Sequence, residues 1–362
     1  MYFGLSEEQT FFQDNVKKFL VDQAPLDVIR QITAEKNTSI QEEIRQGLTN
    51  LGLNALLIPE DYGGLGLDLL FAAAVSEGLG SGVAPIAFTG SYVMAPLAIM
   101  HGGSDVQKEN YLTKISSNTV KFGIGLSEYI GAREDAELII NGNKVNGKAL
   151  FVIDADDASH FILSDDQGTM FIVDADDSGL EVIELTSVDK TRSYVEILLN
   201  NVTAEILDNT VKNNNAIEKT IDAGRIMLAA DSVGAAQVMI DKSVEYAKER
   251  KQFGRVIGSF QAVKHMCAEM TAELEPCYAI VWHAAHCFDY IPEEARLLAC
   301  QSKSHISEVT KMVAKKATEV HGGMGFTDLL GLHYWFKRIG MNRQLLGSPE
   351  LVRDEAGKIQ GF

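Results

Sequence analysis

Cations and amide side chains gather at residues 246–265, the segment best suited to hold an anion. Tyr246–Gly254 reads YAKERKQFG, and Ile257–His265 reads IGSFQAVKH. We expect a helix that ends near Arg250, a tight turn at Gly254 and a second helix capped by Ser259. The guanidinium of Arg250 is always charged and pairs with phosphate through two parallel hydrogen bonds. An arginine at a helix C-terminus also has a structural explanation, its favourable interaction with the helix dipole.

The elements that must position this segment fall into three ranges with different apolar periods. Residues 1–121 follow a mostly helical pattern that starts with Ser6 as the N-cap. Residues 122–210 contain short β-branched and aromatic runs between Asn-Gly and Asp-rich turns, and residues 211–362 return to long helices. The predicted fold class is α+β multidomain: an N-terminal all-α domain, a middle antiparallel β-sandwich or barrel, and a C-terminal four-helix bundle.

Individual elements can be placed within these ranges. In the first helix, one face is expected to carry Phe11, Phe12, Val16 and Phe19. The expected strands are Leu138–Ile140, Ala149–Ile153, His160–Leu163, Met170–Val173, Val182–Leu185 and Tyr194–Leu199. The expected long helices are Ile217–Lys251, Ser259–Tyr290 and Pro292–Val320, with a shorter one after Gly331.

The composition argues against several classes of partner. The 362 residues carry a net charge of −18, whereas binding to nucleic acid or to an anionic membrane requires clustered cations. No apolar run reaches the roughly 18 residues of a membrane-spanning helix, and the first residues lack the features of a secretory signal. The four cysteines have no CxxC spacing, so we expect free thiols in the cytoplasm and no metal site.

Three motifs resemble those of one enzyme family. Arg250–Gly254 together with Phe260-Gln261 resembles the RxxFG…FQ signature of acyl-CoA dehydrogenases. Ile58–Leu67, which reads IPEDYGGLGL, looks like the signature of the family's N-terminal domain, and Val320–Phe326 looks like its late GGxG motif. The motifs follow the family's order on a helical–β–helical layout, and the similarity extends over nearly the whole chain.

The resemblance implies that FAD is the cofactor and that several residues contact it. Arg250, Gln252 and Phe253 match residues that reach across a subunit interface to the FAD diphosphate and adenosine. The other implied cofactor residues are Gln261, Glu319, Gly322, Gly323 and Ser348 in the helical range, and Ser127, Phe151 and Ile153 in the β range.

Several of these positions depart from the family pattern. Leu126-Ser127-Glu128 stands for the family's TEP strand, and the glycine-rich loop after it is shortened to Tyr129–Arg133. Phe151-Val152-Ile153 stands for a W-I-T/S element that covers the flavin ring. Phe151 can still stack on a ring, but Ile153 has no hydroxyl group to donate. Glu319 stands where a glutamine is usual, which adds an anion near a diphosphate.

The usual catalytic base is also missing. The family removes a weakly acidic α-proton from an acyl thioester as hydride leaves for the flavin, so a positioned carboxylate must accept the proton. Most members use the glutamate of a YEGT motif, and here Leu346 occupies that position. Other members place the base on the long helix after the β domain, beside an arginine. Arg225 matches this arginine, with an implied role in substrate binding, but Gly224 stands at the base position.

Asp231 is the remaining candidate for a catalytic acid or base. It lies two helical turns beyond Gly224 on the same face, in an otherwise apolar stretch. Such surroundings favour a raised pKa and a catalytic role. The alternative is a structural acid that pairs with a neighbouring helix or lies at a subunit contact.

The resemblance leaves three functions to compare. Short members that resemble steroid side-chain dehydrogenases form α2β2 heterotetramers in which one subunit supplies the base. The leading hypothesis is an FAD-dependent subunit for α,β-dehydrogenation of an acyl-CoA thioester, with the base supplied by a paralogous partner. The alternatives are a flavin oxidase or hydroxylase on the same fold and a non-catalytic, FAD-binding partner subunit. The expected partners are acyl-CoA, an electron-transferring flavoprotein and other subunits, in a homotetramer or an α2β2 heterotetramer.

Overall fold

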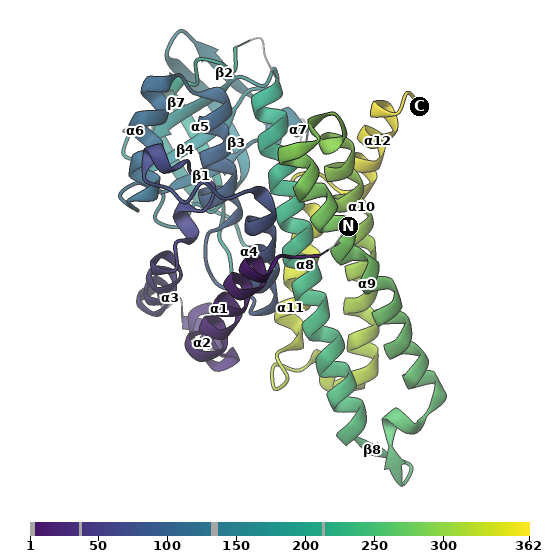
Figure 1. The fold of residues 1–362 in the computed structure, drawn as a ribbon. Coiled ribbons are helices and arrows are strands. Elements are labelled where there is room, and N and C mark those ends of the chain that lie inside the picture. Colours follow the sequence, from purple (N-terminus) through teal and green to yellow (C-terminus); the bar gives the residue numbers. More distant parts are fainter. Residues whose placement is uncertain (1–3, 36–37, 132–136, 212–213) are drawn as a thin grey trace. The chain divides into compact units, whose positions relative to one another are not determined.

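The computed structural model describes residues 4–35, 38–131, 137–211 and 214–362, and Figure 1 shows helices, then strands, then helices along the chain. These residues form two compact units, each described by itself. The helical unit comprises Met1–Asn37, Ala73–Ala84 and Ile226–Phe362, and the β unit comprises Thr38–Ala72 and Pro85–Arg225. Two helices contribute residues to both units, so the units differ from the ranges 1–121, 122–210 and 211–362. Those ranges follow the changes of secondary structure and remain a prediction as domain boundaries.

A closed barrel forms the centre of the β unit. Its strands are β1 (Phe122–Gly125), β2 (Leu138–Asn141), β3 (Lys144–Ile153), β4 (His160–Ser164), β5 (Met170–Asp174), β6 (Leu180–Glu184) and β7 (Tyr194–Ile206). They are ordered β2-β3-β1-β4-β5-β7-β6, and an additional pairing of β3 with β7 closes the ring. The pairs are antiparallel except β1 with β4, which run parallel. The expected barrel is therefore found, but it is not purely antiparallel.

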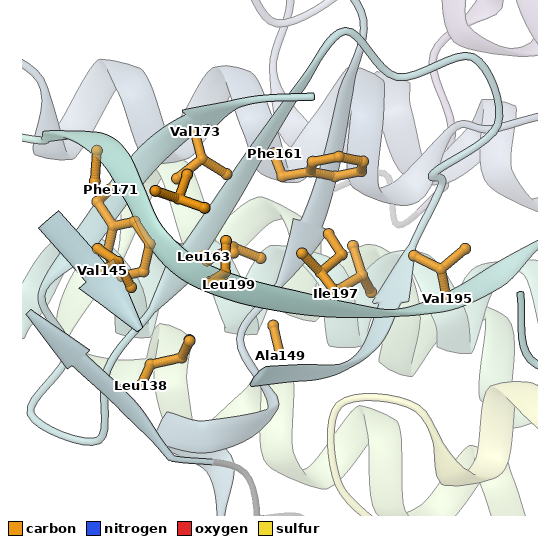
Figure 2. Close-up of a cluster of buried hydrophobic side chains, with 13 residues drawn as sticks. Leu138, Val145, Ala149, Phe161, Leu163, Phe171, Val173, Val195, Ile197 and Leu199 are labelled. Carbon is orange, nitrogen blue, oxygen red and sulfur yellow. The ribbon is translucent and has the colours of Figure 1, made fainter. Parts of the chain in front are cut away.

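Alternating side chains fill the barrel interior. Val145, Phe161, Phe171 and Ile197 are almost fully buried, and Figure 2 shows them turned toward one another from different strands. Burial of each such side chain stabilises the folded state by about 1.5–3 kcal/mol. Strand β3 shifts register at Gly147, where a Cβ atom would lie 1.7 Å from the Glu137 carbonyl oxygen. Only glycine fits this bend of the barrel.

The segment Leu126-Ser127-Glu128, which resembles the family's TEP strand, is not a strand in this structure. Strand β1 ends at Gly125, and Ser127–Ile130 form the short helix α7. The buried Ser127 hydroxyl donates to the Leu150 carbonyl at 2.5 Å, a side-chain bond that takes the place of a strand ladder. The remaining helical elements of this unit are α3 (Thr38–Asn50), η1 (Leu53–Ala55), η2 (Glu60–Tyr62), η3 (Thr89–Met94), α5 (Ala95–Gly102) and α6 (Asp105–Ser116).

Long helices make up most of the helical unit. They are α1 (Glu7–Gln23), α2 (Leu26–Glu35), α9 (Gln261–Tyr290), α10 (Pro292–His321), α11 (Leu332–Gln344) and α12 (Pro349–Ile359). Helices α4 (Leu69–Ser81) and α8 (Asn215–Glu249) contribute residues to both units. The short elements are β8 (Lys251–Gln252), β9 (Arg255–Val256), η4 (Ile257–Ser259) and η5 (Gly322–Phe326). No helix among the described residues is long and apolar enough to cross a membrane.

The first helix confirms its predicted cap but not its predicted face. The Ser6 hydroxyl accepts from the Gln9 backbone at 3.1 Å, and the Gln9 side chain accepts from the Ser6 backbone at 2.8 Å, which is a complete capping box. Of the face expected from Phe11, Phe12, Val16 and Phe19, Val16 is buried and Phe12 and Phe19 are half-buried, but Phe11 is 69% exposed, so its placement is wrong. The fully buried side chains of α1 are Gln9, Gln13, Val16 and Leu20. The Gln13 amide reaches the Ala74 carbonyl at 2.9 Å, so a polar side chain occupies this face.

A buried ion pair joins α8 to α11. Arg338 donates to a carboxylate oxygen of Asp231 at 3.1 Å, and neither side chain has exposed surface. Asn342 donates to the other Asp231 oxygen at 2.6 Å, so both carboxylate oxygens have partners. A second guanidinium nitrogen of Arg338 donates to the Ala84 carbonyl at 2.9 Å. One charged network thus ties α8, α11 and the backbone at Ala84, which follows α4, to one another.

We predict that Asp231→Ala lowers the free energy of unfolding by about 3–5 kcal/mol, because it leaves the Arg338 guanidinium buried without a counter-charge. The exposed Asp241 on the same helix is the matched control, since its carboxylate faces solvent and accepts from the Gln237 amide at 2.8 Å. Urea and thermal unfolding of both variants measure the effect. A loss for Asp231→Ala no larger than that for Asp241→Ala would contradict a structural role of the pair.

Candidate functional site

The predicted site residues lie in both units, and each set is described within its own unit. Those of the β unit are Ser127, Phe151, Ile153, Gly224 and Arg225. Those of the helical unit are Asp231, Arg250, Gln252, Phe253, Gln261, Glu319, Gly322, Gly323, Leu346 and Ser348.

A β-hairpin presents the predicted phosphate-binding side chains to solvent. Strands β8 and β9 pair directly after α8, and their turn contains Phe253 and Gly254 with φ angles of 52° and 77°. Two consecutive left-handed residues define a type I′ turn, which confirms the predicted turn at Gly254. Arg250 and Gln252 are exposed on this hairpin, and the Phe253 ring is 92% exposed. An exposed ring on a strained backbone is a feature of surfaces that bind another molecule.

The residues after the hairpin differ from the prediction in one respect. Ser259 was expected to cap the next helix, but α9 begins at Gln261 with Phe260 as its N-cap. The Ser259 hydroxyl donates instead to the Val256 carbonyl at 2.7 Å within η4. Phe260 packs under the hairpin, with the Arg255 guanidinium 4.0 Å above its ring and the Phe253 ring 6.2 Å away edge-on. This packing holds the hairpin against Phe260. Gln261, the first residue of α9, is exposed.

The end of α10 offers open backbone. Gly322 has φ 59° and ψ −140°, a conformation that is essentially restricted to glycine. A Cβ atom built on Gly322 or on Gly323 meets nothing within 4 Å, so another molecule can approach this backbone closely. Glu319 is exposed in the last helical turn before these glycines. A carboxylate at this place lowers the attraction for an anionic group.

A bulge in β3 presents an aromatic ring. Phe151 has φ 50° at a register shift between Ala149 and Val152, and its side chain is 41% exposed. Bulges that redirect a side chain are common beside binding sites. Ile153, two residues later, is buried, and its backbone pairs with Tyr194 of β7. Its aliphatic side chain has no hydroxyl group to offer a ligand. Of the shortened loop Tyr129–Arg133, residues 132 and 133 lie outside the described part of the chain.

Glu128 is a site residue that the sequence did not single out. One of its carboxylate oxygens accepts from the Leu138 backbone at 2.9 Å, and the other is buried without a hydrogen-bond partner among the described residues. Burial, together with the neighbouring Asp166 and Asp165 charges, raises the pKa of Glu128 to about 7, although the Leu138 hydrogen bond lowers it. The sequence signal that could have predicted this site residue is an acid directly after Ser127 in an otherwise apolar segment.

The positions of the usual bases hold no proton acceptor. Leu346 lies in the turn between α11 and α12 with φ 57°, followed by Gly347 with φ 104°. Gly224 and Arg225 are buried in α8, where the Arg225 guanidinium lies 3.8 Å from the Asp222 carboxylate. The Ser348 hydroxyl caps α12 by accepting from the Leu351 backbone at 3.4 Å. Asp231 is closed within its ion pair, which supports the structural alternative for this residue.

Glu350, the nearest acid to the Leu346 turn in sequence, is held in its charged form. Its backbone N–H, the Ser348 hydroxyl and Arg343 lower the pKa of Glu350 to about 2. Arg343 lies 2.8 Å from Glu350 and 2.7 Å from Glu308. A carboxylate with so low a pKa is a weak proton acceptor at neutral pH.

Comparison with known proteins identifies the family. Residues 214–359 match the family model for the acyl-CoA dehydrogenase C-terminal domain, and residues 6–119 match that for the N-terminal domain. The probable acyl-CoA dehydrogenase YngJ of Bacillus subtilis is 30% identical over 98% of both chains. This chain belongs to the acyl-CoA dehydrogenase family. The predicted fold class and the predicted resemblance are confirmed.

Other relatives of this acyl-CoA dehydrogenase family member differ in their named activities. Acyl-CoA dehydrogenase IpdE2 of Mycolicibacterium smegmatis is 26% identical over 97% of this chain and 99% of its own. The subunit CarC of the caffeyl-CoA reductase-Etf complex of Acetobacterium woodii is 29% identical over 90% of both chains. Among solved structures, the steroid ACAD Tcur3481-Tcur3483 superposes with a TM-score of 0.87 at 25% identity over 98% of both chains.

FAD is the cofactor of the family, and the described residues of this chain fit it. The exposed Arg250 suits a diphosphate, Phe253 and Phe151 suit flat rings, and the open backbone at Gly322 suits close approach. Ile153 is the exception, because it cannot donate the hydrogen bond that the family pattern includes.

We predict that Arg250→Ala reduces FAD affinity about tenfold or more, since a charge-assisted pair with phosphate is lost. The exposed cation Lys248, two residues earlier on α8, serves as the control for net charge. The ratio of flavin to protein absorbance after gel filtration measures retention. Equal flavin content in Arg250→Ala, Lys248→Ala and the unaltered protein would disprove the assignment of Arg250.

Glu128 makes a prediction about pH. Its pKa lies above the ordinary value of 4.5, so between about pH 4.5 and 7 the folded state binds more protons than the unfolded state. The contribution of this carboxyl to stability is therefore present at low pH and is lost as the pH rises through about 7. Glu128→Gln should raise the melting temperature at pH 8 by an amount on the order of 2 °C and have no effect near pH 4.5.

The exposed Glu181 of β6 provides the control for the Glu128 variant. Glu181→Gln removes the same charge from the surface and should not reproduce the pH-dependent rise in melting temperature. A Glu128→Gln protein whose melting temperature follows the unaltered protein at every pH would show that Glu128 titrates as an ordinary surface acid.

Proposed function

We propose that this chain is the base-lacking, FAD-binding subunit of a heteromeric acyl-CoA dehydrogenase. The complex carries out α,β-dehydrogenation of an acyl-CoA thioester, and a paralogous subunit supplies the carboxylate. The observation that carries the proposal is the pair Leu346 and Gly224, the two base positions of the family, neither of which can accept a proton.

The chemistry of the reaction explains why this pair matters. An α-proton of a thioester is weakly acidic, so its removal needs a carboxylate within hydrogen-bond reach. Two acids of this chain are already committed, since Asp231 is closed in an ion pair with Arg338 and Glu350 is held ionised beside Arg343. FAD, when bound, supplies the hydride acceptor. This chain would hold the cofactor through Arg250 and Phe253 rather than move the proton.

The backbone of the Leu346 turn supports descent from an active subunit. A non-glycine residue in the left-handed region costs of order 1–2 kcal/mol, so it persists only where the surrounding structure enforces it. The turn has nevertheless kept φ 57° at Leu346. The likeness to a steroid ACAD and to IpdE2 makes CoA thioesters of steroid side chains or rings the first substrates to test. An electron-transferring flavoprotein is the proposed electron acceptor, since CarC belongs to an Etf complex by name. We place the reaction in the cytoplasm.

The decisive test restores a carboxylate at position 346. The purified chain alone should bind FAD but fail to bleach it with butyryl-CoA or a steroid side-chain CoA thioester. Leu346→Glu should give acyl-CoA-dependent bleaching at least tenfold faster, because it places a carboxylate on the preserved turn. Leu346→Gln, of the same size but without a proton-accepting carboxylate, is the matched control and should stay inactive.

Other outcomes separate the alternatives. Rapid bleaching by the unaltered chain would refute a base-lacking subunit. Flavin that appears only after co-expression with a glutamate-bearing paralogue would indicate a structural partner that completes its FAD site in the complex. Flavin reduced by a substrate without an α-proton and reoxidised by oxygen would indicate an oxidase. Gel filtration of the lone and co-expressed chains distinguishes a homotetramer from an α2β2 heterotetramer.

A further inference from the structure

Three metal-ligating side chains meet where α9 joins α10. The ligand atoms of His283, Cys287 and Glu294 all lie within 4.8 Å of one another. His283 and Cys287 are four residues apart on α9 and so share one face of the helix. Helix α9 ends at Tyr290 and α10 begins at Pro292, so the short connection brings Glu294 in the first turn of α10 back against that face.

The fold holds this corner firmly. Helices α9 and α10 pack along each other over much of their length, as their neighbouring ribbons in Figure 1 show. Cys287 is fully buried, His283 is half-buried and Glu294 is exposed, so the cluster runs from the core to the surface. In the described part of the chain, neither the His283 imidazole nor the Glu294 carboxylate is taken up by a hydrogen bond or ion pair. Both groups are therefore available as ligands.

The donor set selects the ion. A thiolate, an imidazole and a carboxylate are the three side-chain ligands that zinc uses, with bonds of about 2.3, 2.0–2.1 and 2.0–2.2 Å. A tetrahedral ion with these bonds separates its ligand atoms by roughly 3.3–3.8 Å, which the cluster reaches with small side-chain rotations. Calcium and magnesium prefer ligand sets made of oxygen and would leave the sulfur unused.

We propose that His283, Cys287 and Glu294 bind one zinc ion, with water as the fourth ligand, and that the ion clamps α9 to α10. Binding exchanges the thiol proton of Cys287 for the metal, and the proton goes to solvent. No oxidation or reduction is involved. A search for CxxC spacing does not find this site, because its ligands come as His-x3-Cys on one helix and a glutamate on the next.

Cobalt is the test probe, because a cobalt–thiolate bond has its own absorption and cobalt occupies zinc sites. Tag-free protein, treated with a chelator and titrated with cobalt, should show a thiolate-to-metal band and tetrahedral cobalt bands that reach a plateau at one equivalent. Added zinc should remove both bands. Zinc alone should raise the melting temperature, since it binds the folded state.

Three variants decide between a site and a chance cluster. Glu294→Gln alters an exposed side chain and should leave folding intact while weakening zinc binding tenfold or more. Cys287→Ser should remove the sulfur band, whereas Cys267→Ser, a half-buried cysteine of the same helix outside the cluster, should keep it. If cobalt gives no sulfur band with the unaltered protein, or the same band with Cys287→Ser, the site does not exist. Unchanged zinc affinity in Glu294→Gln would likewise overturn the three-ligand assignment.

Discussion

The helical unit is organised around one buried charge pair. Asp231 and Arg338 are fully buried and pair with each other, and Asn342 and the Ala84 carbonyl are further partners of the pair. The pair sits where α4 and α8 are in backbone contact: a Cβ atom on Gly80 would lie 1.9 Å from the Asp231 carbonyl oxygen, and one on Gly234 would lie 1.9 Å from that of Glu77. Helices this close cannot shift to admit another partner for the carboxylate. Asp231 therefore has a structural role in this unit. Its apolar sequence neighbours are equally compatible with a catalytic acid, so the sequence alone could not distinguish the two roles.

Local signals in the sequence were sufficient for most of the fold. The capping box at Ser6, the β-branched runs and the turn at Gly254 depend on neighbours a few residues away, so they could be predicted. The parallel pairing of β1 with β4, the exposure of Phe11 and the helical turn at Ser127 depend on contacts between distant residues. The cofactor residues came from motif resemblance. Glu128 was missed because its unusual surroundings arise only when the barrel closes.

Left-handed backbone recurs at candidate site residues of each unit. Phe151, Phe253 and Leu346 are bulky residues with positive φ, and all three stand at positions where the sequence resemblance places the cofactor or the base. Strain of this kind persists where the surrounding structure enforces it. Each unit thus holds a strained backbone at a candidate site residue.

The aromatic tip of the β8–β9 hairpin has a consequence for the life of the protein in the cell. A phenyl ring that is almost wholly in water gives up about 1.5–3 kcal/mol that burial would return, and it lies among cations on an otherwise strongly acidic chain. In the cell, this ring is therefore a place where the free protein associates with other apolar surfaces unless another molecule covers it.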